Sequence, residues 1–421
     1  MKTQTIGDLS RWVGQTVDLQ GWVMARRSSK DLVFLVMRDG SGLCQCVADR
    51  STLGDAMYDE AEALTQESAF YCRGEVVADP RQIGGHEVRL SEIRTLHLSK
   101  DFPITPKEHG VDFLMDHRHL WLRSKRQWAI MRIRNTLIMA IHGFFQDRGF
   151  VQMDAPIFTD NACEGTSTLF ATDFYGHPAY LSQSGQLYGE AMAMAMGKIY
   201  TFGPTFRAEK SQTRRHLSEF WMIEPEMAFC DLKQNMDLIE EFLRSVVGAV
   251  LEKNRLELEL IERPIEPLQK VTQAFERIPY EEAVQIIRGE RLVNGQSALD
   301  VLRDDLAQVR RSIEETRAEI SDREAKLAQP GLKKGEIGHH QAQLQAARQR
   351  LDQAEEQERN LPQWIESAAN FEAGNDFGGS DETVLTRLFE TPIMVFNWPH
   401  EIKAFYMKRD ENDPRWAKGV D

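Results

Sequence analysis

The chain has 421 residues, of which 42% are hydrophobic and 28% charged, and its formal net charge is −14. This length allows two or three domains, and the composition is that of an ordinary globular protein. No stretch approaches the length of a membrane span, and the first 15 residues lack the apolar core of a secretion signal. The five cysteines show no metal-ligand spacing. We therefore expect a cytoplasmic protein with reduced thiols, no membrane partner and no protein-held metal.

The acidic net charge argues against a nucleic-acid partner, because surfaces that bind phosphates are usually basic. Charge can be segregated, however, and Arg26, Arg27, Lys30 and Arg38 stand close together in the N-terminal part. An acidic protein can bind RNA through such a local face, so the net charge does not decide the question.

Residues 1–100 are predicted to form an all-β module. Short runs rich in Val, Phe and Leu, separated by Gly, Asp and Ser, indicate strands: VDLQGWVMARR, LVFLVMRDG, GLCQCVAD and AFYCRGEVVAD. A small Greek-key barrel of the oligonucleotide-binding type (OB-fold) has about this length and presents aromatic side chains on which bases stack. On pattern alone, an aromatic residue such as Phe34 is more often packed in the core.

Residues 101–125 contain two prolines and no periodicity, which predicts a linker. An amphipathic helix is predicted from about Gln127 to Arg148, because apolar residues recur there at helical spacing. Gly149 ends it, and FVQMDAPIF is predicted to be a strand that reaches Pro156. A helix and strand of this kind fit either an ordinary core or an obligate dimer interface.

The segment Phe206–Phe229, FRAEKSQTRRHLSEFWMIEPEMAF, is predicted to form a strand, a charged loop and a second strand. Fixed cations beside an aromatic face suit a nucleoside triphosphate, since Arg can fork onto a phosphate and Phe can stack on a purine. The residue types alone fit an ordinary mixed-charge surface hairpin equally well.

The order FRAE, loop, RHLxEF and E-P-E resembles motif 2 of the class II aminoacyl-tRNA synthetases, and in detail the asparaginyl members of the aspartyl, asparaginyl and lysyl subgroup. The resemblance covers about residues 1–285 and 371–415. It implies an α+β fold: an N-terminal OB-fold anticodon-binding domain and a catalytic domain built on an antiparallel sheet.

The resemblance also implies a reaction, the ATP-dependent ligation of asparagine to tRNA(Asn) through an asparaginyl-adenylate. By the motif match, Arg207 grips the α-phosphate, His216 reaches the γ-phosphate, Phe220 stacks on adenine, and Glu209 contacts the adenine or the tRNA end. Mg²⁺ bridges the phosphates in this interpretation. Arg207 and His216 are thus the expected catalytic residues.

Further positions follow from the same resemblance. Glu164, Ser184 and Gln186 are expected around the ammonium group of the amino acid, where a carboxylate and neutral acceptors suit a cation. Glu224 and Glu226 stand where the side-chain amide is recognised, and at least one of the two is expected to be structural.

The remaining family positions concern RNA and assembly. Phe34 is expected to stack on an anticodon base and Gln45 to hydrogen-bond to one. Pro156 marks motif 1, the dimer interface of the class, so a homodimer is expected.

The catalytic domain is expected at 126–285 and again at 371–421, interrupted by an insertion at 286–370. Within the insertion two runs of apolar residues at three–four spacing predict an antiparallel helical hairpin with a coiled-coil seam: Leu299, Leu302, Leu306, Val309, Ile313, Thr316, Ile320 and Leu327, then Ile337, His340, Leu344, Ala347, Leu351, Ala354 and Leu361. We expect this seam to be buried within the hairpin itself.

Two alternatives to an asparaginyl enzyme are an aspartyl-tRNA synthetase, against which E-P-E and IKAFYM argue, and a non-catalytic tRNA-binding paralogue. The Gly-rich motif 3 of class II synthetases, with its Arg for the γ-phosphate, is not found after Phe220. The sequence therefore predicts a truncated or paralogous chain that is nearly inactive in adenylation.

Overall fold

The structure is a computed structural model that describes residues 4–160, 169–208, 216–329 and 331–421. The chain divides into two compact units. The first comprises Met1–Asn135 with Asn254–Arg263, and the second comprises Thr136–Lys253 with Pro264–Asp421. The boundary falls inside one helix, α5 (Lys125–Gln146). This helix begins two residues before Gln127, the start predicted for it.

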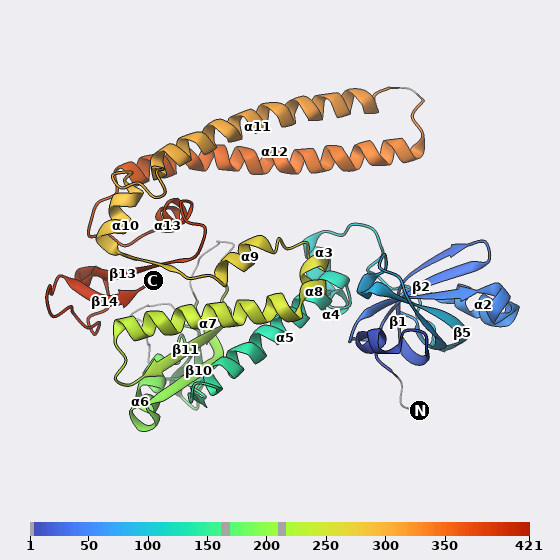
Figure 1. Ribbon diagram of the computed structural model, residues 1–421, viewed down its shortest axis with the longest axis horizontal. Coiled ribbons are helices and arrows are strands. Elements are labelled where there is room, and N and C mark those ends of the chain that lie inside the picture. The colour runs from blue at the N-terminus through green and yellow to red at the C-terminus, as the bar shows by residue number, and fades with distance from the viewer. Residues whose placement is uncertain (1–3, 161–168, 209–215, 330) are drawn as a thin grey trace. The chain divides into compact units, whose positions relative to one another are not determined.

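The first unit contains a closed five-stranded barrel, with strands in the order β1-β2-β3-β5-β4 (Figure 1). The strands are β1 (Thr16–Ser29), β2 (Leu32–Arg38), β3 (Leu43–Asp49), β4 (Ala69–Ala78) and β5 (His86–His97). Its helical segments are η1 (Ile6–Trp12), α1 (Arg50–Leu53), α2 (Asp55–Ala63), η2 (Ile83–Gly85), α3 (Val111–Asp116), α4 (Arg118–Trp121) and α8 (Arg255–Leu260). The predicted OB-fold barrel is confirmed, and β5 is the strand that lies outside the four predicted runs.

Alternation along β2 shows why these residues form a barrel wall. Val33, Leu35 and Met37 are fully buried inside, while Phe34 and Val36 lie half-buried on the outer face. Phe34 is therefore not a core residue. Cys44 and Cys46 alternate in the same way along β3 and are both buried free thiols, as expected.

A buried ion pair joins the barrel to the segment that follows it. Arg38 donates to Glu67 at 2.8 Å, and Arg123 donates to the same carboxylate at 3.1 Å. Arg38 also donates to the backbone carbonyl of Arg123 at 3.0 Å. The predicted linker 101–125 is thus partly helical, through α3 and α4, and is bonded to the barrel at its end.

The second unit is organised around a three-stranded sheet in the order β11-β10-β6. Its strands are β6 (Val151–Met153), β10 (Lys198–Phe206) and β11 (Glu219–Met227). One face is covered by α5 and by α7 (Leu232–Lys253), which run alongside the strands (Figure 1). Phe144, Phe145 and Tyr200 lie in this apolar layer, with ring centroids 4.7 Å apart for Phe145 and Tyr200.

The two strands of the predicted strand–loop–strand segment are confirmed, with β10 and β11 antiparallel and Phe206 opposite Glu219, whereas residues 209–215 of the predicted loop lie outside the described residues. The sheet itself is mixed, because β6 pairs with β10 in parallel. Two smaller sheets follow the orders β12-β13-β14 and β7-β9-β8. They comprise β7 (Phe158–Thr159), β8 (Ala171–Phe174), β9 (His177–Leu181), β12 (Glu276–Pro279), β13 (Ile393–Pro399) and β14 (Trp416–Val420).

The insertion is the predicted helical hairpin, formed by α11 (Ala298–Leu327) and α12 (Lys334–Ala369) (Figure 1). Ion pairs cross between the helices, including Arg310–Glu358 at 2.9 Å and Arg350–Glu319 at 2.6 Å. The apolar residues of the seam are not all buried within the hairpin itself, however. Leu302 and Leu361, near its base, belong to one core with α10 (Tyr280–Ile287), α13 (Gly379–Thr386) and β13.

The other helical segments of this unit are α6 (Gln186–Met196), α9 (Glu266–Val271) and η3 (His400–Ile402). Among the helices that the structure describes, none is both long and apolar enough to cross a membrane.

Candidate functional site

The face of the β10–β11 hairpin opposite α5 and α7 carries the predicted polar residues. In the register of the two strands Thr201 lies opposite Glu224, and Thr205 lies opposite Phe220. Because side chains alternate between faces, Phe220, Glu224 and Glu226 share the face that α5 and α7 leave open. The sequence therefore folds so that Ile223 and Met227 pack toward the core and Glu224 and Glu226 line the opposite face.

Glu224 is fixed by donors from two elements. Its carboxylate accepts from the Thr201 hydroxyl at 3.1 Å and from the backbone N–H of Gly185 at 2.9 and 3.1 Å. The hydroxyl of Ser184 also donates to it. Ser184 and Thr201 are buried, with exposed fractions of 5% and 3%. An ionised carboxylate has about four acceptor positions, so these three donors leave room for one more.

Position 185 must be a glycine because there is no room for a side chain between α6 and the strands. A Cβ atom at this position would lie 2.8 Å from the Thr201 hydroxyl and 2.9 Å from a Glu224 oxygen. Any larger residue would push the first turn of α6 away from the strand. The Ser184 hydroxyl also accepts from the backbone N–H of Gln186 at 3.1 Å, which caps the start of this helix.

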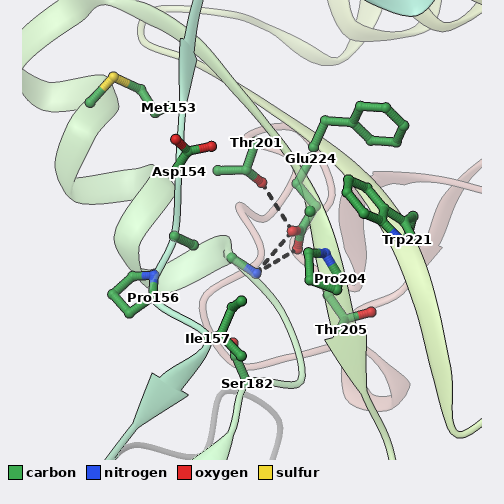
Figure 2. A pocket seen from close by; sticks show the side chains of 14 residues that line it. Met153, Asp154, Pro156, Ile157, Ser182, Thr201, Pro204, Thr205, Trp221 and Glu224 are labelled. Carbon is green, nitrogen blue, oxygen red and sulfur yellow. Dashed lines mark hydrogen bonds between the residues drawn. The ribbon is translucent and has the colours of Figure 1, made fainter. Parts of the chain in front are cut away.

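A cavity of about 210 Å³ opens beside Glu224 (Figure 2). Asp154, Pro156, Thr201 and Trp221 line it together with Glu224, and the dashed hydrogen bonds in Figure 2 show the carboxylate bonded to Thr201 and to a backbone nitrogen. Pockets for whole drug-sized ligands are about 300–1,000 Å³. This cavity therefore suits a smaller group, such as the side chain of an amino acid.

Glu226 has different surroundings from Glu224. Burial raises its pKa to about 7, and the negative charges of Glu190 and Glu224 add to the effect. Gly189 of α6 lies over it, since a Cβ there would be 3.2 Å from Cγ of Glu226. Near neutral pH the carboxyl group of Glu226 is therefore partly protonated, whereas donors surround Glu224.

Gln186, at the start of α6, is held by one residue of its own helix and by one residue from the C-terminal part of the second unit. Its Nε2 donates to Glu190 Oε1 at 3.0 Å and to the hydroxyl of Tyr406 at 3.2 Å. The structure thus brings Ser184, Gln186, Glu224 and Glu226 together on one side of the hairpin.

Arg207 and Phe220 form the neighbouring part of the site. The guanidinium carbon of Arg207 lies 5.4 Å from the centroid of the Phe220 ring, and the Arg207 backbone N–H donates to Ser218 at 3.0 Å. His216 is exposed just before β11. A cation beside a half-buried aromatic ring is an arrangement that accommodates both a phosphate and a base. Glu164 and Glu209 lie outside the described residues.

On the barrel, Phe34 and Gln45 lie on the outer face of adjacent strands. Gln45 is opposite Val36, and its amide donates to Glu87 at 3.3 Å. The guanidinium of Arg27 lies 4.7 Å from the Phe34 ring centroid. An aromatic ring and a cation on an open barrel face suit a stacked base with its phosphate.

Pro156 is exposed and follows β6, next to Ile157 and Phe158, whose exposed fractions are 45% and 59%. Among the residues that the structure describes, no group of three or more His, Cys, Asp or Glu side chains could hold a metal ion.

Sequence reasoning missed the residues that support the predicted ones. Thr201, Gly185, Glu190 and Tyr406 all bond to a predicted site residue. Thr201 could be found only from the strand register. The contact between Glu190 and Gln186 could have been predicted, because the two residues stand four positions apart on one helix.

The comparisons with known proteins agree with this geometry. A family model described as "tRNA synthetases class II (D, K and N)" matches residues 110–421, and one described as "OB-fold nucleic acid binding domain" matches residues 17–96. An asparagine–tRNA ligase of Sorangium cellulosum is 47% identical over 415 residues, which covers 98% of this chain and 78% of that protein. One of Symbiobacterium thermophilum is 42% identical and covers 100% and 80%.

Among solved structures, asparaginyl-tRNA synthetase of Pyrococcus horikoshii complexed with asparaginyl-adenylate matches with a TM-score of 0.73 at 30% identity, covering 100% of this chain and 80% of that one. The barrel, the β10–β11 hairpin and the polar face define a class II aminoacyl-tRNA synthetase. Within that class the chain belongs to the asparagine–tRNA ligase family.

Proposed function

We propose that the chain activates asparagine with ATP and transfers it to tRNA(Asn), and that the open face of the β10–β11 hairpin is where activation occurs. The carboxylate of asparagine attacks the α-phosphorus of ATP, pyrophosphate leaves, and a terminal ribose hydroxyl of the tRNA then displaces AMP. Chemistry of this kind depends on positioning and charge neutralisation more than on a protein base. The observation that carries the proposal is that Arg207, Phe220 and Glu224 lie on one face.

In the nucleotide half, Arg207 would neutralise the charge that grows on the α-phosphate during attack. Phe220, whose ring lies beside that guanidinium, would stack on the adenine. His216 at the start of β11 would reach the γ-phosphate, and Glu209 would contact the adenine or the tRNA end. Mg²⁺ bound with the ATP would help to neutralise the phosphate charge, and we assign it no protein ligand among the described residues.

In the amino-acid half, we assign recognition of the side-chain amide to Glu224. Its three donors hold the carboxylate in place, and its remaining acceptor position can take an N–H of asparagine. Aspartate would instead bring a second negative charge, which the half-buried carboxylate of Glu224 repels. Ser184, Gln186 and Glu164 would surround the ammonium group, and Glu226 would be a supporting residue.

For the RNA, we propose that Phe34 stacks on an anticodon base and that Gln45 hydrogen-bonds to one. The exposed apolar residues after β6, with Pro156 among them, would form the interface of a homodimer, because clustered exposed apolar side chains mark interaction surfaces. A cytoplasmic location stays a prediction.

Calorimetric titration with two non-hydrolysable adenylate analogues tests the proposal. The ligands are the sulfamoyl analogues of asparaginyl-adenylate and aspartyl-adenylate. We expect the asparaginyl analogue to bind at least 100-fold more tightly, because a site that hydrogen-bonds a polar group strongly rejects an analogue that cannot pair. Preference for the aspartyl analogue would indicate an aspartyl-tRNA synthetase. Binding of tRNA without binding of either analogue would indicate a non-catalytic paralogue.

A further inference from the structure

Gln186 bonds to two residues that the functional assignment leaves unexplained. It is the first residue of α6, and its side-chain nitrogen donates to Glu190 at 3.0 Å and to Tyr406 at 3.2 Å. Glu190 stands four residues later on the same helix, where side chains of one face meet. Tyr406 comes from the segment between η3 and β14, 220 residues away in sequence.

These contacts decide which way the amide of Gln186 is turned. A carboxamide has two N–H donors on nitrogen and an acceptor oxygen, whereas an ionised carboxylate only accepts. Glu190 therefore requires the nitrogen end of the amide. The hydroxyl of Tyr406 accepts the second N–H, so the carbonyl oxygen is the end directed away from both partners.

The orientation matters because of where Gln186 begins its helix. It follows Ser184 and Gly185, both of which donate to Glu224 beside the 210 Å³ cavity. An ammonium group needs acceptors, and an amide turned the other way would present it with two N–H groups. Proper orientation of Gln186 is thus a condition for binding the amino group.

We propose that Glu190 and Tyr406 are positioning residues that fix the amide of Gln186 with its oxygen toward the amino group of the amino-acid substrate. This inference rests on the proposed function, since it concerns the same site. It also assigns a role to the exposed segment around Tyr406. That segment contacts α6 through the hydroxyl of Tyr406. It therefore links the C-terminal part of the second unit to amino-acid binding.

The test compares two ligands that differ only in the amino group. One is the sulfamoyl analogue of asparaginyl-adenylate, and the other is its deamino counterpart, built on succinamate. Both are titrated by calorimetry against the wild-type chain, Tyr406→Phe and Glu190→Gln. Glu401→Gln, which changes an exposed carboxylate near the same segment, is the matched control.

We expect Tyr406→Phe to weaken the asparaginyl analogue about 2- to 10-fold, the usual effect of one hydrogen bond. Glu190→Gln should weaken it by about 10-fold or more, because glutamine can also donate and lets the Gln186 amide turn over. Binding of the deamino analogue should change less than about twofold in each variant, and Glu401→Gln should behave as wild type.

Equal losses for the two ligands would show that Glu190 and Tyr406 only support the fold, and absence of any loss would show that they do not act on Gln186. Either result overturns the inference. Both leave the proposed function intact, provided that the wild-type chain prefers the asparaginyl over the aspartyl analogue. Loss of that preference in the wild type would instead overturn the proposed function itself.

Discussion

Two carboxylates that stand two residues apart on β11 have opposite surroundings. Glu224 accepts from Thr201, Gly185 and Ser184. Glu226 accepts no hydrogen bond from any residue that the structure describes, and burial together with the charges of Glu190 and Glu224 raises its pKa to about 7. The first is therefore held in place to accept a hydrogen bond from an amide, and the second is a group whose ionisation is unfavourable in the folded protein.

Ionisation of Glu226 should lower stability as the pH rises. The ordinary pKa of a glutamate is 4.5 and that of folded Glu226 is about 7, so between these values the folded state binds more protons than the unfolded state. Its favourable contribution is complete below pH 4.5 and is lost as the pH rises through about 7. We predict that the melting temperature falls less between pH 5 and pH 8 in Glu226→Gln than in wild type.

Differential scanning calorimetry at several pH values measures this difference. Glu219→Gln, which changes an exposed carboxylate on the same strand, is the matched control and should keep the wild-type dependence. An unchanged slope in Glu226→Gln would show that Glu226 titrates like an exposed residue.

The site residues differ in how far the sequence could predict them. Arg207, Phe220 and Glu224 belong to one ordered motif, and antiparallel pairing of its strands brings them together as expected. Thr201 carries no such signal, because only the register Thr201–Glu224 gives it a role. Tyr406 meets Gln186 across 220 residues, a contact that no local pattern encodes.

At the scale of elements, local periodicity predicted most of the architecture. The hairpin followed from its three–four spacing, and four barrel strands followed from alternating apolar residues. β5 was missed because its buried residues, Val88, Leu90 and Ile93, are separated by charged ones. A bulge shifts the register between Arg73 and Gly74 of its partner β4, so the period of two is interrupted.

The ion pair between Arg38 and Glu67 should contribute strongly to barrel stability. The Glu67 side chain is 4% exposed and that of Arg38 is 9% exposed, so removing the carboxylate leaves a buried guanidinium without its counter-charge. Such a change costs about 3–5 kcal/mol. We predict this loss for Glu67→Ala in the free energy of barrel opening, measured by hydrogen exchange of β2 and β4 amides.

The control for that experiment is Glu62→Ala, which removes an exposed carboxylate from α2. It should change the same free energy by less than about 0.5 kcal/mol. Similar values for the two variants would mean that solvent reaches the Arg38–Glu67 pair.

The base and the outer part of the hairpin should differ in importance. Leu302 and Leu361 share a core with α10, α13 and β13, whereas Ile313 and Ala347, farther out on the hairpin, are buried without belonging to that core. We predict that replacing residues 314–355 by a short Gly-Ser linker leaves the melting temperature of the remaining protein nearly unchanged. Replacing 299–361 should lower it by several degrees, because the shared core is opened.

Both deletions are compared by calorimetry and circular dichroism. Equal stability of the two proteins would show that the base residues are dispensable. Aggregation of the shorter deletion would show that the outer hairpin covers another surface of the protein.

For the whole molecule, the exposed apolar residues around Pro156 predict association. Val151, Ile157 and Phe158 have exposed fractions of 41%, 45% and 59%, and Met139 on α5 is 61% exposed. We predict that the chain sediments as a dimer at micromolar concentration and that Phe158→Asp shifts it toward the monomer, because a charge would be buried in the interface. Phe174→Asp, at another exposed phenylalanine, is the matched control, and a monomeric wild-type chain would contradict the proposed interface.

In the proposed site Glu224 distinguishes asparagine from aspartate, and the ratio of two dissociation constants tests this role. Calorimetry gives the dissociation constants of the asparaginyl and aspartyl sulfamoyl analogues for wild type, Glu224→Gln and Glu226→Gln. We predict that the preference for the asparaginyl analogue falls about 10- to 100-fold in Glu224→Gln, because a hydrogen bond to a carboxylate and a repulsion are both removed. In Glu226→Gln the preference should stay within about threefold of wild type. An unchanged preference in Glu224→Gln, or a collapse only in Glu226→Gln, would contradict the assignment.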